Sequence, residues 1–179
     1  MLDFIDFIKT NWRELLALTR EHIFIVFIST GLAVLIGLPL GILLTRIKSL
    51  QTPILGFANI MQTVPSLALF GFLIPVLGAY GIGRIPALIA LFVYALLPII
   101  RNTFTGIRGV DPAVRDAAIG MGMTGSQLLR LVELPLAASV IVAGLRVATV
   151  ISVGTATIAA ATKRTYQGGP VAEPTSSPL

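Results

Sequence analysis

Four apolar stretches, which contain a single charged residue between them, alternate with shorter charged segments along the 179-residue chain. The first runs from Ile23 to Thr45, the second from Ile54 to Gly83, and a shorter third from Ile85 to Ile100. The fourth runs from Leu134 to Thr162 and is interrupted only by Arg146. Because about 20 apolar residues in a helix cross the hydrocarbon core of a bilayer, this pattern predicts four membrane-spanning helices.

The two ends of the chain have different patterns. In residues 1–22, apolar side chains recur at helical spacing with charges between them, which predicts an amphipathic surface helix with Trp12 as an interfacial anchor. A polar lead-in to the first span is the alternative. Residues 163–179 are rich in Gly, Pro, Ser and Thr, which predicts a disordered tail. The membrane domain would then occupy residues 23–162.

Composition supports the same picture. The chain is 55% hydrophobic and only 12% charged, whereas a soluble domain carries about 25% charged residues. We therefore expect an all-α, polytopic membrane helix bundle in contact with the lipid bilayer. The net charge of +5 does not indicate nucleic-acid binding, because the basic residues lie mostly between the apolar stretches.

The distribution of these basic residues predicts the orientation in the membrane. The first loop carries Arg46 and Lys48, and the second loop carries only Arg84. The third loop carries four arginines: Arg101, Arg108, Arg115 and Arg130. Since short cytoplasmic loops are enriched in Lys and Arg, the first and third loops should be cytoplasmic and the N-terminus outside.

The third loop also carries local helix signals. Asp111 followed by Pro112 is typical of an N-cap and first helical residue, so a short helix should follow through Ala118. Three glycines then interrupt it: Gly120, Gly122 and Gly125. Thr124 and Gln127 have the spacing of a capping box for a second helix, which leads toward the fourth span at Leu134 and Pro135.

The same loop resembles the cytoplasmic coupling loop of bacterial ABC-importer permeases. That family pattern runs Glu-Ala-Ala, three residues, Gly, nine residues, Ile, one residue and Leu-Pro. In this chain Asp and Val replace the Glu and the Ile, and the matching positions are Asp116, Ala117, Ala118, Gly122, Val132, Leu134 and Pro135. The resemblance implies a permease domain whose coupling loop, residues 108–133, contacts an ATPase, with Asp111 and Arg115 in the contact as well. An ordinary interhelical loop is the alternative.

Three further stretches look like the permeases of osmoprotectant importers, which take up glycine betaine, carnitine, choline or related quaternary amines. They are Met61–Pro75, Arg101–Pro112 and Ala143–Ala160. The resemblance implies a multi-pass protein of the bacterial inner membrane with three kinds of protein partner. These are a cytoplasmic ATP-binding-cassette ATPase, a second permease subunit and an extracytoplasmic solute-binding protein, whose aromatic boxes would hold the solute by cation–π attraction.

Other functions remain open at this level. A permease for methionine or a phosphonate would share the coupling loop, although Met61–Pro75 favours the osmoprotectant branch. An ion-coupled carrier would need intramembrane acids, and the four apolar stretches contain no Asp or Glu. A transport-inactive truncated permease is a further alternative. Family members continue after the fourth helix with a glycine-rich turn and another membrane helix, whereas this chain leads into a polar tail, so we expect it to assemble but import poorly.

No catalytic, cofactor or metal site is expected in this chain. It contains no cysteine and a single histidine, His22, and it carries neither a nucleophile elbow nor a P-loop. ATP and Mg²⁺ should therefore be bound by the partner ATPase.

Polar positions within the apolar stretches are candidates for the translocation path. The second stretch is interrupted by Gln62, Thr63, Pro65 and Ser66, where proline frees a backbone carbonyl. Freed polar backbone is tolerated where it lines a cavity or packs on protein, so a purely structural kink is the alternative. Arg146 could also line the path, although pairing within the protein or snorkelling is favoured because a cation would repel a quaternary amine.

Small residues form stripes on two of the predicted spans. On the first span they are Gly37 and Gly41. On the fourth they are Gly144, Ala148, Ser152, Ala156 and Ala160. Such spacing permits close helix contact and could serve either packing within one subunit or pairing of subunits. Without a further helix, we expect the stripe on the fourth span to be open to lipid or to a neighbouring subunit.

Overall fold

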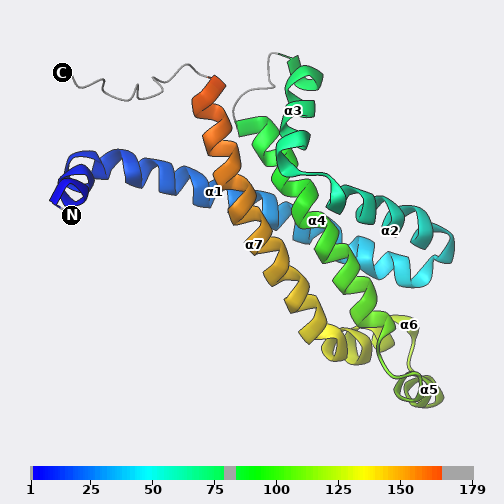
Figure 1. The fold of residues 1–179 in the computed structure, drawn as a ribbon. Coiled ribbons are helices and arrows are strands. Elements are labelled where there is room, and N and C mark those ends of the chain that lie inside the picture. The colour runs from blue at the N-terminus through cyan, green and yellow to red at the C-terminus, as the bar shows by residue number, and fades with distance from the viewer. Residues whose placement is uncertain (1, 79–83, 167–179) are drawn as a thin grey trace, which may run out of the picture.

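The computed structural model describes residues 2–78 and 84–166, and these residues are helical apart from short connections. In chain order the elements are α1 (Leu2–Arg46), α2 (Lys48–Thr63), α3 (Ser66–Leu77), α4 (Arg84–Arg108), α5 (Pro112–Gly120), α6 (Gly125–Gln127), a π-helical turn η2 (Leu128–Glu133) and α7 (Leu134–Tyr166). Figure 1 shows α1, α4 and α7 crossing at the centre of the molecule, with α5 and α6 at one end.

Within the described residues, three helical segments are long and apolar enough to cross a membrane. They are Ile8–Arg46, Ile85–Arg108 and Gly125–Thr157. The helices α2 and α3 pass the same test only as a pair, with a bend of 102° between them. The structure is therefore an all-α membrane bundle with three spans, or four if the bent pair counts as one, and the predicted fold class is confirmed.

The second apolar stretch, predicted as one helix followed by a glycine-rich exit, contains two helices. α2 ends at Thr63 and α3 begins at Ser66, so the break falls at Val64 and Pro65. Proline lacks an N–H group and disfavours helical backbone in the preceding residue, which accounts for the extended ψ of 124° at Val64. The sequence located the interruption correctly, but the prediction of a single helix was wrong.

Helix α1 continues through the boundary that was predicted between the amphipathic segment and the first span. Residues 2–30 contain neither glycine nor proline, so no residue in this stretch favours a helix end near position 22. Figure 1 shows the N-terminal part of α1 extending away from α4 and α7. Residues 2–22 are helical as predicted, but they do not form a separate surface helix.

Small residues allow the three central helices to approach one another closely. A side-chain carbon added to Gly41 of α1 would lie 2.5 Å from Cβ of Thr103 in α4, well inside normal contact distance. One added to Gly144 of α7 would lie 2.5 Å from Cβ of Asn102, also in α4. The backbones of α1 and α7 therefore pack directly on α4, which larger residues at these positions would prevent.

The small-residue stripe on α7 faces the inside of the bundle. Ala148 and Ser152 are fully buried and Ala156 nearly so, and Ser152 accepts a 3.4 Å hydrogen bond from Thr30 of α1. The described part of the stripe therefore serves packing within one subunit. The expectation that it would be open to lipid or to a neighbouring subunit was wrong, because α1 and α4 cover it. The side chain of Ala160 lies outside the described residues.

Helix α7 begins at Leu134, where the fourth span was predicted to start. It ends at Tyr166, so Lys163 to Tyr166 are helical and do not belong to a disordered tail as predicted. The remainder of the expected tail, residues 167–179, lies outside the described residues.

Candidate functional site

Helix α5, which the sequence analysis expects to contact an ATPase, starts and stops at the predicted residues. Oδ1 of Asp111 accepts a 2.9 Å hydrogen bond from the backbone N–H of Ala113, and Pro112 occupies the first helical position. The helix ends at Gly120, and Gly122 follows with a positive φ of 83°, a conformation that glycine adopts without strain. Short-range chemistry in the sequence therefore fixes both ends of this nine-residue helix.

The connection from α5 to α7 is fixed by a reciprocal capping box. The backbone N–H of Thr124 donates to Oε1 of Gln127 over 2.8 Å, and the N–H of Gln127 donates to Oγ1 of Thr124 over 3.4 Å. This box opens α6, which continues through η2 directly into α7. Helix α5 is therefore joined to the membrane span α7 by a short loop, residues 121–124, followed by an uninterrupted helical segment.

The structure divides the coupling-motif residues into two groups. Asp116, Ala117 and Gly122 are exposed at the end of the molecule, whereas Ala118 is only 2% exposed. Ala118 thus packs inside the chain, and only Ala117 of the two alanines lies where a partner could approach. Leu134 is half-buried and Pro135 exposed at the start of α7.

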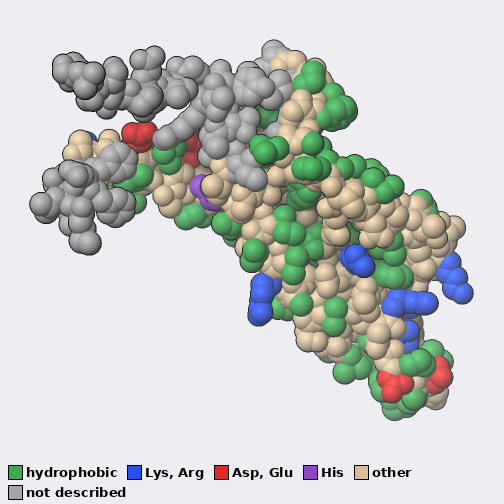
Figure 2. Space-filling view, viewed as in Figure 1, with side chains coloured by type: hydrophobic (Ala, Val, Ile, Leu, Met, Phe, Trp, Pro, Cys, Tyr) green, Lys and Arg blue, Asp and Glu red, His purple; other side chains and the backbone are tan. Residues whose placement is uncertain are grey.

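Around α5, large apolar side chains remain exposed. Ile119 is 57% exposed and Met121 is 72% exposed, and Val114 is exposed on the same helix. Figure 2 shows green apolar and red acidic side chains together at this tip of the molecule, with Lys and Arg side chains nearby. A short helix that presents apolar side chains beside charges is suited to protein contact.

Glu133 is the buried acid behind this surface. Its side chain is 2% exposed, and its Oε2 lies 2.6 Å from Nη2 of Arg46 at the end of α1. Its Oε1 lies 3.1 Å from Nε of Arg115 in α5, an ion pair whose geometry is not that of an aligned hydrogen bond. Arg115 also donates from Nη2 to the backbone carbonyl of Ile107, near the end of α4.

The sequence-based prediction missed Glu133. It assigned Arg46 only to the orientation of the membrane domain, and Arg115 to ATPase contact, although Arg115 is mostly buried against Glu133. A signal was available, because Glu133 is an isolated acid at the start of an apolar run, on the side where both arginine-bearing loops were expected. Glu133 lies one residue before the fourth apolar stretch and within the helical segment Gly125–Thr157.

The polar interruption of the second stretch lies at the break between α2 and α3. Gln62, Thr63 and Pro65 are exposed, and Ser66 is half-buried. The hydroxyl of Tyr94 in α4 donates a 2.5 Å hydrogen bond to the carbonyl of Val64 at this break. At least one freed carbonyl is therefore satisfied by a neighbouring helix, as the structural alternative expected, while the polar side chains next to it remain accessible.

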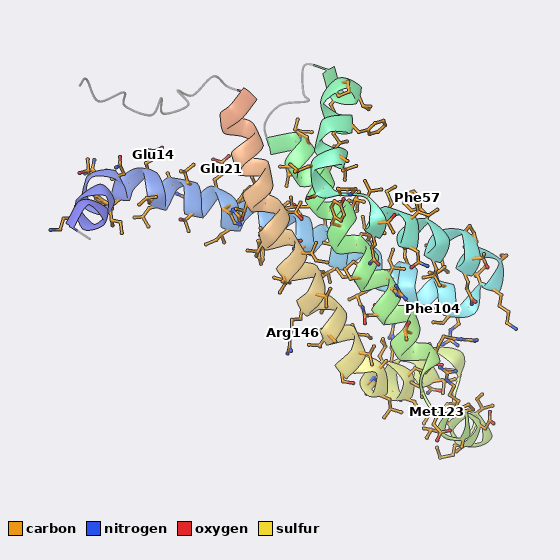
Figure 3. All side chains as sticks on the ribbon, in the orientation of Figure 1. Glu14, Glu21, Phe57, Phe104, Met123 and Arg146 are labelled. Atoms are coloured by element: carbon orange, nitrogen blue, oxygen red, sulfur yellow. The ribbon has the colours of Figure 1, made fainter. Side chains whose placement is uncertain are left out.

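Arg146 does not join these residues. It is exposed on α7, and Figure 3 shows it projecting away from α4 and from Phe57 of α2. It forms no ion pair or hydrogen bond with the part of the chain that the structure describes. The favoured pairing within the protein is therefore not observed, and a place for Arg146 on the translocation path stays a prediction.

Comparison with known proteins gives consistent matches. Residues 33–164 match the family described as "Binding-protein-dependent transport system inner membrane component". The chain is 51% identical over 155 residues to the choline transport system permease protein OpuBB of Bacillus subtilis (strain 168), covering 87% of this chain and 70% of that protein. It is 46% identical over 161 residues to the osmoprotectant import permease protein OsmW of Salmonella typhimurium, covering 89% and 75%.

The fold has a counterpart among solved structures. A chain of the MetNI methionine ABC transporter in an inward-facing conformation matches with a TM-score of 0.72 and 26% identity. The match covers 88% of this chain and 82% of that chain.

Proposed function

Because the chain belongs to the family of binding-protein-dependent transport system inner membrane components, we propose that it is the membrane subunit of an ATP-driven importer for quaternary-amine osmoprotectants. The observation that carries the mechanistic part is α5, a short capped helix with exposed apolar side chains at one end of the bundle. An ATPase that docks on α5 acts on α7 through α6 and η2, since these elements are continuous.

Three partners complete the proposal. A cytoplasmic ATP-binding-cassette ATPase binds ATP and Mg²⁺ and contacts α5, since this sequence has no phosphate-binding loop of its own. A second permease subunit pairs with this chain around the translocation path. An extracytoplasmic solute-binding protein delivers the solute, as the description of the family suggests.

The solute class rests on the named relatives. OpuBB is named for choline transport, and a second Bacillus subtilis relative, OpuCB, is named for glycine betaine, carnitine and choline, with 46% identity over 159 residues. The methionine transporter is similar in fold but only 26% identical. The sequence comparison therefore favours quaternary amines over methionine, the alternative that the coupling loop alone left open.

Reconstitution tests the solute class. The chain is placed in proteoliposomes with its ATPase and binding protein, and uptake of labelled choline, glycine betaine, carnitine and methionine is measured with and without ATP. ATP-dependent uptake of at least one quaternary amine is expected. Uptake of methionine alone, or no ATP-dependent uptake of any of the four, would contradict the proposal.

A charge substitution tests the ATPase contact. Ile119→Glu places a carboxylate on the exposed face of α5, where it should weaken co-purification of the ATPase without preventing membrane insertion. Ser49→Glu is the control, because it adds the same charge at an exposed position of α2 and leaves the surface of α5 unchanged. Equal co-purification of the ATPase with both variants would count against α5 as its docking site.

A further inference from the structure

Glu133 joins four separate segments of the chain at the end of the bundle that carries α5. The carboxylate contacts Arg46 at the last residue of α1 and Arg115 in α5. Arg115 in turn donates to the carbonyl of Ile107 near the end of α4. Glu133 itself is the last residue of η2 and immediately precedes α7.

The burial pattern shows that this arrangement is specific. Glu133 is 2% exposed, whereas the Arg46 and Arg115 side chains are 44% and 22% exposed. A buried carboxylate without a partner is strongly unfavourable. Loss of an ion-pair partner therefore costs more free energy for the buried Glu133 than for the two more exposed arginines. Removing one partner therefore disturbs the junction more than removing an exposed surface charge.

Glu133 lies at the end of the π-helical turn η2. A π-helical turn accommodates one extra residue, and each residue of an α-helix advances the side-chain direction by about 100°. Leu131 and Glu133, two residues apart, therefore point to roughly opposite faces: Leu131 is 65% exposed while Glu133 is buried. Such turns occur often at functional sites, where they direct one side chain at the expense of regular hydrogen bonding.

We propose that Glu133 is a positioning residue that fastens the coupling helix α5 to the end of α1, so that a displacement of α5 by the ATPase moves α1 together with α7. This inference rests on the proposed function. The chain connects α5 to α4 at its start and, through α6 and η2, to α7 at its end, whereas α1 has no such covalent connection to α5 and packs on α4 and α7. The Arg46–Glu133–Arg115 cluster adds a direct contact between α5 and the end of α1.

A distance measurement on the permease itself tests whether Glu133 links α5 to the end of α1. The chain has no native cysteine, so spin labels can be placed at the exposed positions Leu43 of α1 and Met121 beyond α5. A second pair, Leu43 and Val142 of α7, monitors the bundle alone. Dilution of labelled chains with excess unlabelled chains confines the signal to pairs within one subunit.

If Glu133 links α5 to α1, substitutions in the cluster should change the distance between α5 and α1 but not the distances within the bundle. Glu133→Gln and Arg46→Gln should broaden the Leu43–Met121 distance distribution and leave Leu43–Val142 unchanged. Lys48→Gln is the matched control, since Lys48 is an exposed cation two residues after Arg46 and should change neither distribution. An unchanged Leu43–Met121 distribution in both variants would overturn the proposal. Broadening of both distributions would overturn it as well, because Glu133 would then stabilise the whole bundle.

A transport measurement separates coupling from assembly. With the complete importer, Arg46→Gln should retain bound ATPase but import about tenfold less solute per ATP hydrolysed, within the range typical of coupling between sites. Arg46→Lys, which keeps a cation opposite Glu133, should recover part of this loss. An unchanged ratio of solute to ATP in Arg46→Gln would refute the coupling role. The distance measurement requires neither ATPase nor solute, so it remains decisive if the proposed function fails.

Discussion

The hydroxyl of Tyr94 donates a 2.5 Å hydrogen bond to the carbonyl oxygen of Val64, linking α4 to the break between α2 and α3. Tyr94 is only 9% exposed, so water cannot readily replace this donor. A side chain of another helix, thirty residues further along the chain, thus stabilises the bend of 102° between α2 and α3.

Replacing Tyr94 tests this contact. Tyr94→Phe keeps the ring but leaves the Val64 carbonyl without its donor, which should cost about 1–3 kcal/mol of stability. Thermal unfolding of the detergent-solubilised protein measures the loss. Thr149→Val is the control, since its hydroxyl bonds only to the carbonyl of Leu145 in its own helix, at an exposed position. An equal effect of both substitutions would show that the Tyr94 contact has no special role.

Gly41→Ala should weaken the packing of α1 on α4. The added methyl group would lie 2.5 Å from Cβ of Thr103 and 3.0 Å from the carbonyl oxygen of Ile100, so the helices must separate. Overpacking of this kind costs about 1–3 kcal/mol. Gly31→Ala in the same helix meets nothing within 4 Å and should gain up to about 1 kcal/mol from helix propensity. Opposite shifts of the melting temperature are therefore expected, and shifts of the same sign would contradict the close α1–α4 contact.

Asp111→Ala should loosen α5. The substitution removes the acceptor for the N–H of Ala113 and should cost about 0.5–2 kcal/mol in the stability of this short helix. Hydrogen exchange over residues 112–120 reports the change directly. Asp111→Asn retains an N-capping oxygen and should exchange nearly as slowly as the native chain. Equal exchange in the Ala variant and the native chain would mean that the cap does not limit opening of α5.

The orientation in the membrane can be measured by cysteine labelling. Since the chain has no native cysteine, Ser49→Cys, Ile82→Cys and Ala113→Cys each provide a single reactive site. The distribution of basic residues predicts that an impermeant maleimide labels position 82 in intact cells and spares positions 49 and 113. The structure places Arg46 and Arg115 on one carboxylate, as expected if the first and third loops lie on the same side. Labelling of positions 49 and 113 with sparing of position 82 would reverse the topology.

Local signals in the sequence predicted the coupling segment well. The Asp111 cap, the Pro112 start, the glycine after α5 and the capping box of Thr124 and Gln127 each depend on residues within one helical turn. Their geometry follows from short-range hydrogen bonding and backbone preference, so no knowledge of the tertiary structure is needed. The apolar lengths predicted the membrane-spanning parts of α1, α4 and α7, but not the division of the second stretch into α2 and α3.

Contacts between distant segments could not be predicted in this way. The ion pair of Arg46 and Glu133 joins residues separated by most of the membrane domain, and Glu133 lies at the end of an irregular π-helical turn. The size of the bend at Pro65 likewise depends on how α2, α3 and α4 pack, although proline marked its position. The sequence also left open whether the small-residue stripe on α7 packs within its own subunit or against a second subunit. Small residues permit close helix packing in both cases.

The length of α1 has a mechanical consequence. Its 45 residues form a rod of about 68 Å, more than twice the roughly 30 Å thickness of the hydrocarbon core. The buried residues of α1 lie in its C-terminal half, from Val26 to Leu44, where it packs on α4 and α7. A small tilt of α1 about this packed half therefore becomes a large displacement of its first turns. Trp12, the sole tryptophan of the chain, lies in that distant part and is half-exposed. Its fluorescence therefore offers a native indicator of tilting in α1, without any label.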